Sequence, residues 1–512
     1  MKVNSICIVG GGSSGWLMAM ALDKNLPNTK VTLVESPHVP TIGVGESTIP
    51  SITRFIENTL GLDQKEFMRS CDATYKGGIR FKDFLQKGED VWHPFTTGEE
   101  QSRNGMNWLA KKAMLPDLSI EDYWRSNYVS YTMCIKNKFD RQEDKDSSYG
   151  HHIDAAKFVE FCQSKFKGTH VLATVNEVQS VEDTITAIVT DMGTIQADMF
   201  IDCTGFKALL IGEALKEPFI SYSDTLLNDT ALTCRIPYEN KRDELQSFTD
   251  CTALSAGWVW NTPLWSRIGT GYVYSSKFQT KESAESEFRE YLTLKFGKDR
   301  ANNAEFNTVK YRTGIRKRAW VGNCLALPLA AGFVEPLEST GLASIADGID
   351  KFLDILKLGQ DSTLLRSMYN KRAEASFKEI HDFVLMHYLN SKRNDSKYWR
   401  HIKNNIEIPE SVLEYLMTGK PLNSTAVREK GGAWFGGRQL EAVLVGMGTP
   451  SMFSVDTIAD NNQRYLRNYT GELREQALAG LSFIDREIQL NKMAVSDMLN
   501  HEDYLLREVY TN

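Results

Sequence analysis

The most constraining stretch of this sequence is a glycine-rich run that follows its first short strand. A β-rich segment, residues 5–9, leads into Gly10-Gly11-Gly12-Ser13-Ser14-Gly15, and a helical pattern and a second strand at residues 31–35 come next. That second strand ends in Glu35, twenty residues after Gly15. Glycines in this pattern let the backbone approach a pyrophosphate, and an acid at this distance accepts hydrogen bonds from a ribose. The stretch predicts an ADP-containing cofactor at Gly10, Gly12, Ser13, Gly15 and Glu35, and a ligand-free glycine turn is the alternative.

Two later stretches fit the same cofactor fold. The loop that contains Gly43, Val44 and Gly45 is bracketed by prolines, which indicates a backbone that passes close to another group. A plain connector is its alternative interpretation. Residues 197–205 form an apolar strand that ends at Gly205, and this strand resembles the sheet edge of glutathione-reductase-type FAD folds.

A third stretch, Gly332 to Gly341, lies between an apolar run and the helical pattern of residues 342–358. Backbone N–H groups at a helix start are unpaired and carry partial positive charge, so they favour an anion. Glu338 beside such a site suggests chemistry. The plainer interpretation is a capped helix whose first turn is acidic.

Bulk properties exclude several classes of protein. The 512 residues indicate about two to four domains. A net charge of −7 argues against nucleic acid or an anionic membrane as partner. The eight cysteines are scattered without zinc spacing, so we expect no metal, buried thiols and a reducing, cytoplasmic location. No apolar run is long enough to predict a membrane span.

The order of these elements predicts an α/β protein with a Rossmann-like FAD-binding fold of the glutathione-reductase and flavin-monooxygenase type. An antiparallel substrate-side sheet and a helical C-terminal cap complete it. We expect an FAD-binding domain over residues 1–350, with substrate-side insertions at about 80–150 and 220–310. The mostly helical cap covers residues 351–512.

Two further features carry potential chemistry. Lys76 lies between a predicted helix and a glycine pair. Such a lysine is usually a surface charge, but a buried one can donate a hydrogen bond or react as an amine. Trp258 and Trp260 lie on the same face of a predicted strand, where they either fill a core or form a wall.

Together these motifs resemble the flavin-dependent halogenase family, the group typified by tryptophan halogenases. The resemblance covers residues 3 to about 350 in the right order. It rests on the Gly10–Gly15 turn, the Gly43–Pro50 loop, Gly257-Trp258-x-Trp260-x-x-Pro263 and the Gly332–Gly341 stretch, with support from His152-x-Asp154-Ala155 and Trp92-His93-Pro94-Phe95.

The resemblance implies that FAD, used as FADH2, and dioxygen oxidise a halide ion to hypohalous acid. The halide (chloride, bromide or iodide) would bind near the amides of Thr340 and Gly341, and Leu337 would contact the cofactor. The hypohalous acid would pass a tunnel at Trp258 and Trp260 to reach Lys76, which holds it by hydrogen bonding or as a haloamine. Glu338 would orient the electrophile or accept the ring proton, and Ser339 would couple the two chambers. Because only one dinucleotide motif is present, a separate flavin reductase would supply the reduced flavin.

The substrate side departs from the best-known members of that family. Thr262 stands where the family usually has isoleucine, and residues 433–437 do not show the aromatic and acidic cluster that clamps free tryptophan. We therefore expect a small electron-rich arene, an indole or a phenol, in contact with His93, Phe95 and Trp434. A flavin-dependent aromatic monooxygenase and a flavin-binding sensor or scaffold are the rival interpretations, and a homo-oligomer stays open.

Overall fold

The computed structural model describes residues 3–39, 43, 45–95, 119–141, 148–358, 363–413, 443, 446–447 and 472–511. They belong to two compact units, each assembled from three segments of the chain. The first unit comprises Met1–Thr74, Gly150–Pro237 and Leu264–His381, and the second comprises Tyr75–Tyr149, Tyr238–Pro263 and Asp382–Asn512. The division expected from the sequence, 1–350 and 351–512, stays a prediction about which segments fold independently.

A six-stranded sheet forms the base of the first unit, with the order β21-β22-β13-β1-β2-β9. Its central strand β1 pairs in parallel with β2 on one side and β13 on the other. Strand β2 pairs in parallel with β9, and β13 pairs in parallel with β22. Parallel strands that are buried on both faces have continuous apolar sequences, and β1 has such a sequence. The predicted α/β architecture is confirmed. The strands are β1 (Ser5–Val9), β2 (Lys30–Glu35), β9 (Thr169–Leu172), β13 (Met199–Asp202), β21 (Trp320–Val321) and β22 (Cys324–Ala326).

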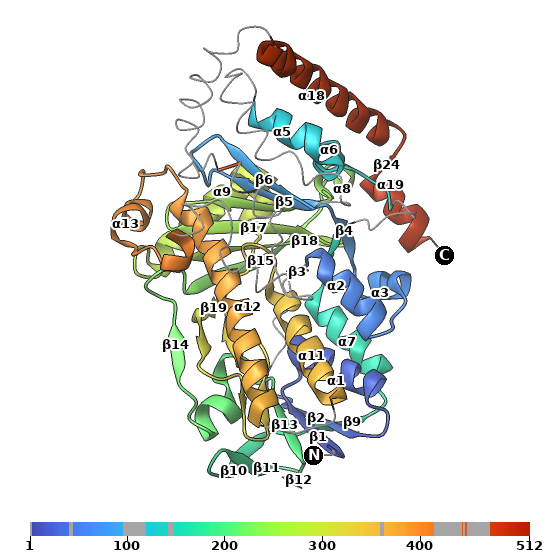
Figure 1. Cartoon of the computed structure of the whole chain (residues 1–512), viewed down its shortest axis with the longest axis vertical. Coiled ribbons are helices and arrows are strands. Elements are labelled where there is room, and N and C mark those ends of the chain that lie inside the picture. The colour runs from blue at the N-terminus through green and yellow to red at the C-terminus, as the bar shows by residue number, and fades with distance from the viewer. Residues whose placement is uncertain are drawn as a thin grey trace. The chain divides into compact units, whose positions relative to one another are not determined.

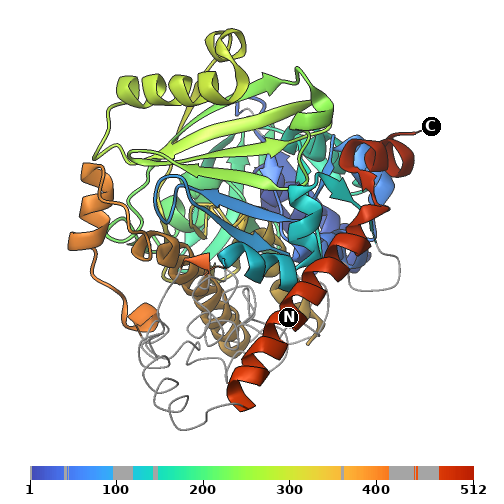
Figure 2. The same cartoon turned by 90° about the horizontal axis from the view of Figure 1, so that it is seen from above.

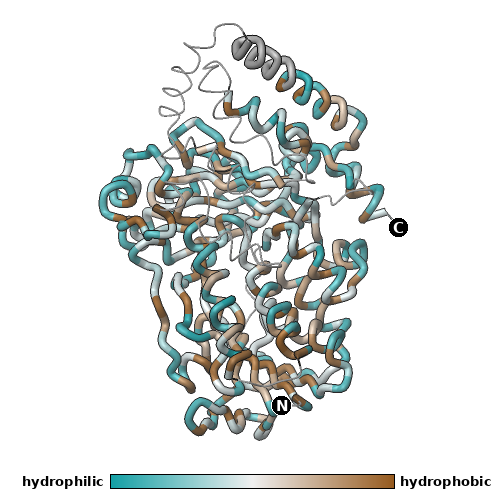
Figure 3. The backbone as a smooth tube through the Cα atoms, in the orientation of Figure 1, coloured by the Kyte–Doolittle hydropathy of each residue, from teal (hydrophilic) through white to brown (hydrophobic). Residues whose placement is uncertain are grey.

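Helices α1 (Ser13–Asn25), α7 (Ala155–Lys165) and α11 (Gly341–Lys357) pack beside this sheet (Figure 1). Helix α1 contacts β1, β2, α7 and α11, and hydrophobic positions gather in this part of the unit (Figure 3). Asp154 caps the N-terminus of α7, because its Oδ1 accepts hydrogen bonds from the amides of Ala156 and Lys157 at 3.0 and 3.3 Å.

The first unit also contains antiparallel strands, in which β15 (Thr230–Pro237) pairs with both β18 (Arg267–Tyr274) and β19 (Asn307–Lys310). The short strand β3 (Glu46–Ser47) pairs with β8 (Gly150–Ile153). The remaining elements are α2 (Pro50–Arg54), η1 (Phe55–Thr59), α3 (Gln64–Ser70), β10 (Val175–Val181), β11 (Thr184–Thr190), β12 (Gly193–Ile195), η3 (Gly205–Lys207), η4 (Leu209–Ala214), β14 (Phe219–Ser221), α9 (Lys281–Phe296), α10 (Lys298–Asn302), β20 (Gly314–Arg316) and β23 (Gly332–Phe333).

The second unit is built on the strands β17-β16-β5-β6, of which β16 and β5 run parallel and the other neighbours antiparallel. Helix α18, the long red helix in Figure 2, packs on α5 and α6. Its elements are β5 (Gly78–Lys82), β6 (Asp90–Pro94), α5 (Ile120–Asn127), α6 (Val129–Ile135), β7 (Lys138–Phe139), α8 (Lys241–Glu244), β16 (Thr249–Ala253), β17 (Gly257–Pro263), α13 (Lys397–Asn405), α18 (Glu472–Ser496), β24 (Leu499–Asn500), α19 (His501–Leu505) and η5 (Leu506–Tyr510). The strand β4 (Thr74–Lys76) and the helix α12 (Thr363–Leu389) run from the first unit into the second.

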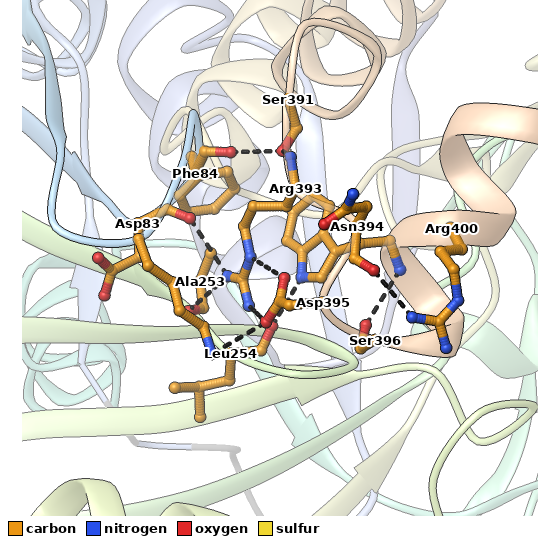
Figure 4. Close-up of polar contacts among 12 residues, drawn as sticks. Asp83, Phe84, Ala253, Leu254, Ser391, Arg393, Asn394, Asp395, Ser396 and Arg400 are labelled. Atoms are coloured by element: carbon orange, nitrogen blue, oxygen red, sulfur yellow. Dashed lines mark hydrogen bonds and ion pairs between the residues drawn. The ribbon is translucent and has the colours of Figure 1, made fainter.

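A buried arginine fastens the segment after α12 to the strands of the second unit (Figure 4). Arg393 donates to the carbonyl oxygens of Asp83 and Ala253 at 3.2 and 3.0 Å, and its two other nitrogens each lie 2.9 Å from the carboxylate of Asp395. This guanidinium holds the pKa of Asp395 well below its usual range. Paired with a carboxylate and two carbonyls, the buried charge is compensated and the segment has one defined position.

Among the helices of the described residues, none combines the length and the apolar character that crossing a membrane requires.

Candidate active site

The three motif glycines have different surroundings. Gly10 has a φ of +113°, and a Cβ on it would overlap the carbonyl of Cys203. A Cβ on Gly15 would overlap the carbonyl oxygen of Gly10, so both positions are closed to side chains. A Cβ on Gly12 would have no atom within 4 Å. This residue directly precedes α1, whose first residue is Ser13, so the open side of the turn lies at a helix N-terminus, where a phosphate fits.

Glu35 is fixed beside the same turn. It ends β2, and its side chain lies against Gly11, because a Cβ on that glycine would overlap the Glu35 carboxyl. His170 Nε2 is 3.0 Å from Glu35 Oε2. No pattern in the sequence indicates this histidine, because it reaches Glu35 only through the pairing of β9 with β2.

The turn after β13 is held by one buried carboxyl group. Asp202 accepts hydrogen bonds from the amide and hydroxyl of Thr204 at 3.0 and 2.6 Å, and from the amides of Leu210 and Ile211 at 2.8 Å each. Burial raises the pKa of Asp202, and these four hydrogen bonds oppose that rise. Gly205, three residues after Asp202, has a φ of +64° and open space at its Cβ position. It therefore offers a second close approach to a ligand.

The second glycine loop meets the Gly332–Gly341 stretch. Ser47 Oγ is 3.1 Å from Ser339 Oγ, although 292 residues separate them. Glu46 Oε2 lies 3.9 Å from the position that a Cβ on Gly341 would take. Gly43 accepts a 2.7 Å hydrogen bond from Arg235, and Val44 lies outside the described residues. Two motifs that the sequence could only name separately thus form one site.

Helix α11 begins at Gly341, so the two acids of the motif precede the helix and do not occupy its first turn. The acidic-first-turn interpretation is therefore wrong. Ser339 is buried and has a φ of +60°, a left-handed conformation that costs a non-glycine residue about 1–3 kcal/mol. Leu337, Glu338 and Thr340 are also buried. The positive end of α11 therefore opens beside a strained, enclosed turn, which suits an anion.

The lysine predicted to carry chemistry lies in the second unit and is fully buried. Lys76, the last residue of β4, is 0% exposed, and its Nζ lies 5.0 Å from the centroid of the Phe95 ring. The surface-charge interpretation of this residue is therefore wrong. Gly77 donates to Ser247 O at 2.7 Å and accepts from the amide of Phe95 at 2.8 Å, which brings the aromatic ring to the lysine.

Two other groups lie in the same region. His93 is buried, with its ring 5.7 Å from Phe95 and 6.0 Å from Phe383 between centroids. Burial raises the pKa of Cys134 to about 12, although the charge of Lys76 acts in the opposite direction. The predicted contact residue Trp434 lies outside the described residues.

The two tryptophans of the strand motif lie together. The ring centroids of Trp258 and Trp260 are 6.1 Å apart at an angle of 57°, with Trp258 buried and Trp260 half-buried. Thr262, two residues further along β17, is buried, and its hydroxyl has no hydrogen-bond partner among the described residues. Within the part of the chain that is described, no group of three or more potential ligands could hold a metal ion.

Comparison with known proteins connects these features. The family model of tryptophan halogenase matches residues 5–460. Tryptophan 6-halogenase SttH of Streptomyces toxytricini is 34% identical over 443 residues, which cover 80% of this chain and 83% of that protein. The solved apo structure of VirX1 has a TM-score of 0.86 at 31% identity, covering 100% of this chain and 99% of that one. Xcc4156, a flavin-dependent halogenase from Xanthomonas campestris, has a TM-score of 0.82 at 27% identity and covers 99% of this chain and 98% of its own.

Proposed function

The chain belongs to the tryptophan halogenase family and is a flavin-dependent halogenase of an aromatic substrate, and we propose the roles that its individual residues have in this reaction. The first unit holds FAD and the halide ion, and the second holds the halogenating electrophile at Lys76. The resemblance read from the motifs is confirmed, and the hydroxylase alternative is not favoured. A separate flavin reductase supplies the reduced cofactor.

We assign FAD to the glycine turns of the first unit. Two features support this assignment: the space at Gly12 is open, and the backbone is closely packed at Gly10 and Gly15. A pyrophosphate must come close to the backbone of this turn, and a side chain at Gly12 would block it. Glu35, positioned by His170, is the ribose acceptor. The other residues that we assign to the cofactor are Ser13, Gly43, Val44, Gly45, Gly205 and Leu337.

Reduced flavin, when bound, reacts with dioxygen and so supplies the oxidant for a halide ion. We place that ion at the backbone amides of Thr340 and Gly341, at the start of α11. Chloride, bromide and iodide all fit this chemistry, because N–H groups at a helix start recognise charge and carry little selectivity for size. Ser339 links this site to the Gly43–Pro50 loop through Ser47, and we assign it the coupling of the flavin and substrate sites.

Lys76 is the residue to which we assign the hypohalous acid. A buried ammonium group against an aromatic ring can donate a hydrogen bond to it. The uncharged amine can instead exchange one N–H hydrogen for the halogen and release water. Passage of the acid along Trp258 and Trp260 stays a prediction from the resemblance. Glu338 has the role of orienting the electrophile or accepting the proton that the ring loses.

For the substrate we propose a small electron-rich arene of the indole or phenol class. SttH acts on tryptophan at position 6, but residues 433–437 lack the cluster expected for clamping the free amino acid. His93 and Phe95 are proposed to contact the ring, because both lie beside each other near Lys76. The sequence-based assignment of Trp434 to the same role stays a proposal.

The cofactor assignment rests on the difference between the open position at Gly12 and the closely packed positions at Gly10 and Gly15, and substitutions at these glycines test it. Gly12→Ala is expected to fold normally, because its Cβ meets open space, but to lower FAD affinity by at least about tenfold and product formation in parallel. Gly15→Ala is expected to lower thermal stability, because its Cβ overlaps the Gly10 carbonyl oxygen. FAD titration and thermal unfolding measure both effects. Wild-type FAD affinity in Gly12→Ala would show that the pyrophosphate lies elsewhere.

A further inference from the structure

Glu46 is a carboxyl group to which the proposed function gives no role, although it lies at the proposed halide site. It begins β3, directly after the glycine loop, and its Oε2 would be in van der Waals contact with any side chain at Gly341. The next residue, Ser47, is bonded to Ser339 on the other side of the same turn. Glu46 is thus held next to the start of α11 by its own strand.

We propose that Glu46 is the proton-binding partner of the halide, so that the anion and a proton enter this site together. The inference rests on the proposed halide position at Thr340 and Gly341. A halide beside an ionised carboxylate would meet electrostatic repulsion at this half-buried position, because solvent screens the two charges only in part. Beside the neutral carboxyl group the halide meets no second negative charge, and the O–H can donate a hydrogen bond to it.

The protonation behaviour of Glu46 agrees with this role. Burial raises the pKa of Glu46 from its usual value to about 7. The carboxyl group therefore gains and loses its proton close to neutral pH, and a bound halide would raise the pKa further.

The neighbouring charged groups have partners of their own. His151 and His152 lie on β8, the strand paired with β3, and Asp154 directly follows that strand; Arg235 bonds the glycine loop, and Glu338 precedes Ser339. Asp154 is paired with Arg267 at 2.7 Å, and Arg235 donates to the carbonyl of Gly43. His151 is 3.1 Å from Gln64 Nε2, and His152 is 3.1 Å from Thr74 Oγ1. Glu338 is buried and directly precedes Ser339 and Thr340 in the sequence.

Joint uptake of halide and proton also matches the balance of the reaction. Halide, arene, reduced flavin, dioxygen and one proton give the aryl halide, oxidised flavin and two water molecules. Conversion of halide and arene to aryl halide releases two electrons, reduced flavin gives two more, and dioxygen takes all four. The reaction thus consumes one proton for each halide ion, and Glu46 is placed to bring it.

The test is bromide binding to the protein loaded with oxidised FAD, without turnover. Bromide is titrated between about pH 6 and pH 9 by flavin fluorescence, and proton uptake is followed with an indicator dye in weak buffer. We expect affinity to fall about tenfold per pH unit above the pKa of Glu46, with close to one proton taken up per bromide on that limb. Glu46→Gln is expected to bind bromide with an affinity independent of pH and without proton uptake.

Glu160→Gln is the matched control, because Glu160 is an exposed carboxylate on α7 in the same unit, and it is expected to behave as the wild type. Bromide binding by the wild type without proton uptake would overturn the role of Glu46, whether or not the variant folds. An unchanged pH dependence in Glu46→Gln would do the same. Failure of bromide to bind at any pH would overturn the halide site itself together with the inference.

Discussion

Replacement of Lys76 by methionine is expected to abolish halogenation, lowering the rate of product formation by at least about a thousandfold. Methionine has nearly the same length but neither a hydrogen-bond donor nor a nucleophilic nitrogen, and Lys76 is fully buried beside Phe95. FAD affinity and flavin-dependent oxygen consumption are expected to continue, because the cofactor is assigned to glycines of the first unit. Product mass, FAD titration and an oxygen electrode measure the three quantities.

Lys82→Met provides the matched control, since Lys82 ends β5 in the same unit and is exposed. It is expected to halogenate at the wild-type rate. If Lys76→Met keeps more than a small fraction of wild-type halogenation, the electrophile does not depend on this lysine. The proposed role of Lys76 in holding the hypohalous acid would then be wrong.

Glu338→Gln is expected to slow halogenation by about a hundredfold to ten-thousandfold, the range found when a general base is removed. The substitution keeps the shape of this buried side chain but removes its ability to accept a proton. The rate of the chemical step, measured in a single turnover with excess reduced FAD, is expected to fall, while bromide affinity changes little.

Glu335→Gln separates this effect from general damage to the same turn. Glu335 is also fully buried, and its Oε2 accepts a 2.8 Å hydrogen bond from Asn228, so we expect this substitution to lower thermal stability more than the rate. Equal rates for Glu338→Gln and the wild type would leave Glu338 a structural residue of the turn.

Local patterns predicted much of the first unit. The strand, glycine turn, helix and acid of residues 5–35 occur where the sequence places them, because each depends on short-range periodicity and turn chemistry. Helix α13 lies within the region predicted to be mostly helical, although only three of its nine residues are buried. The alternative that places the two acids in the first turn of α11 fails, since a backbone turn at Ser339 with positive φ leaves no mark in the residue types.

The contacts that complete the site could not be read from the chain. Ser47 meets Ser339 and His170 meets Glu35 across separations of 292 and 135 residues. Such pairings depend on which strands become neighbours in the sheets, and periodicity does not encode that order. For the same reason the sequence assigns no role to Glu46, which belongs to the Gly43–Pro50 loop and is brought next to Gly341 only by the fold.

The most direct test of the account is the mass of the product. The protein is incubated with FAD, a flavin reductase, NADH and either chloride or bromide against a panel of indoles and phenols. We predict products whose isotope pattern follows the halide supplied, and none when halide is left out. A hydroxylated product that forms with or without halide would contradict the account.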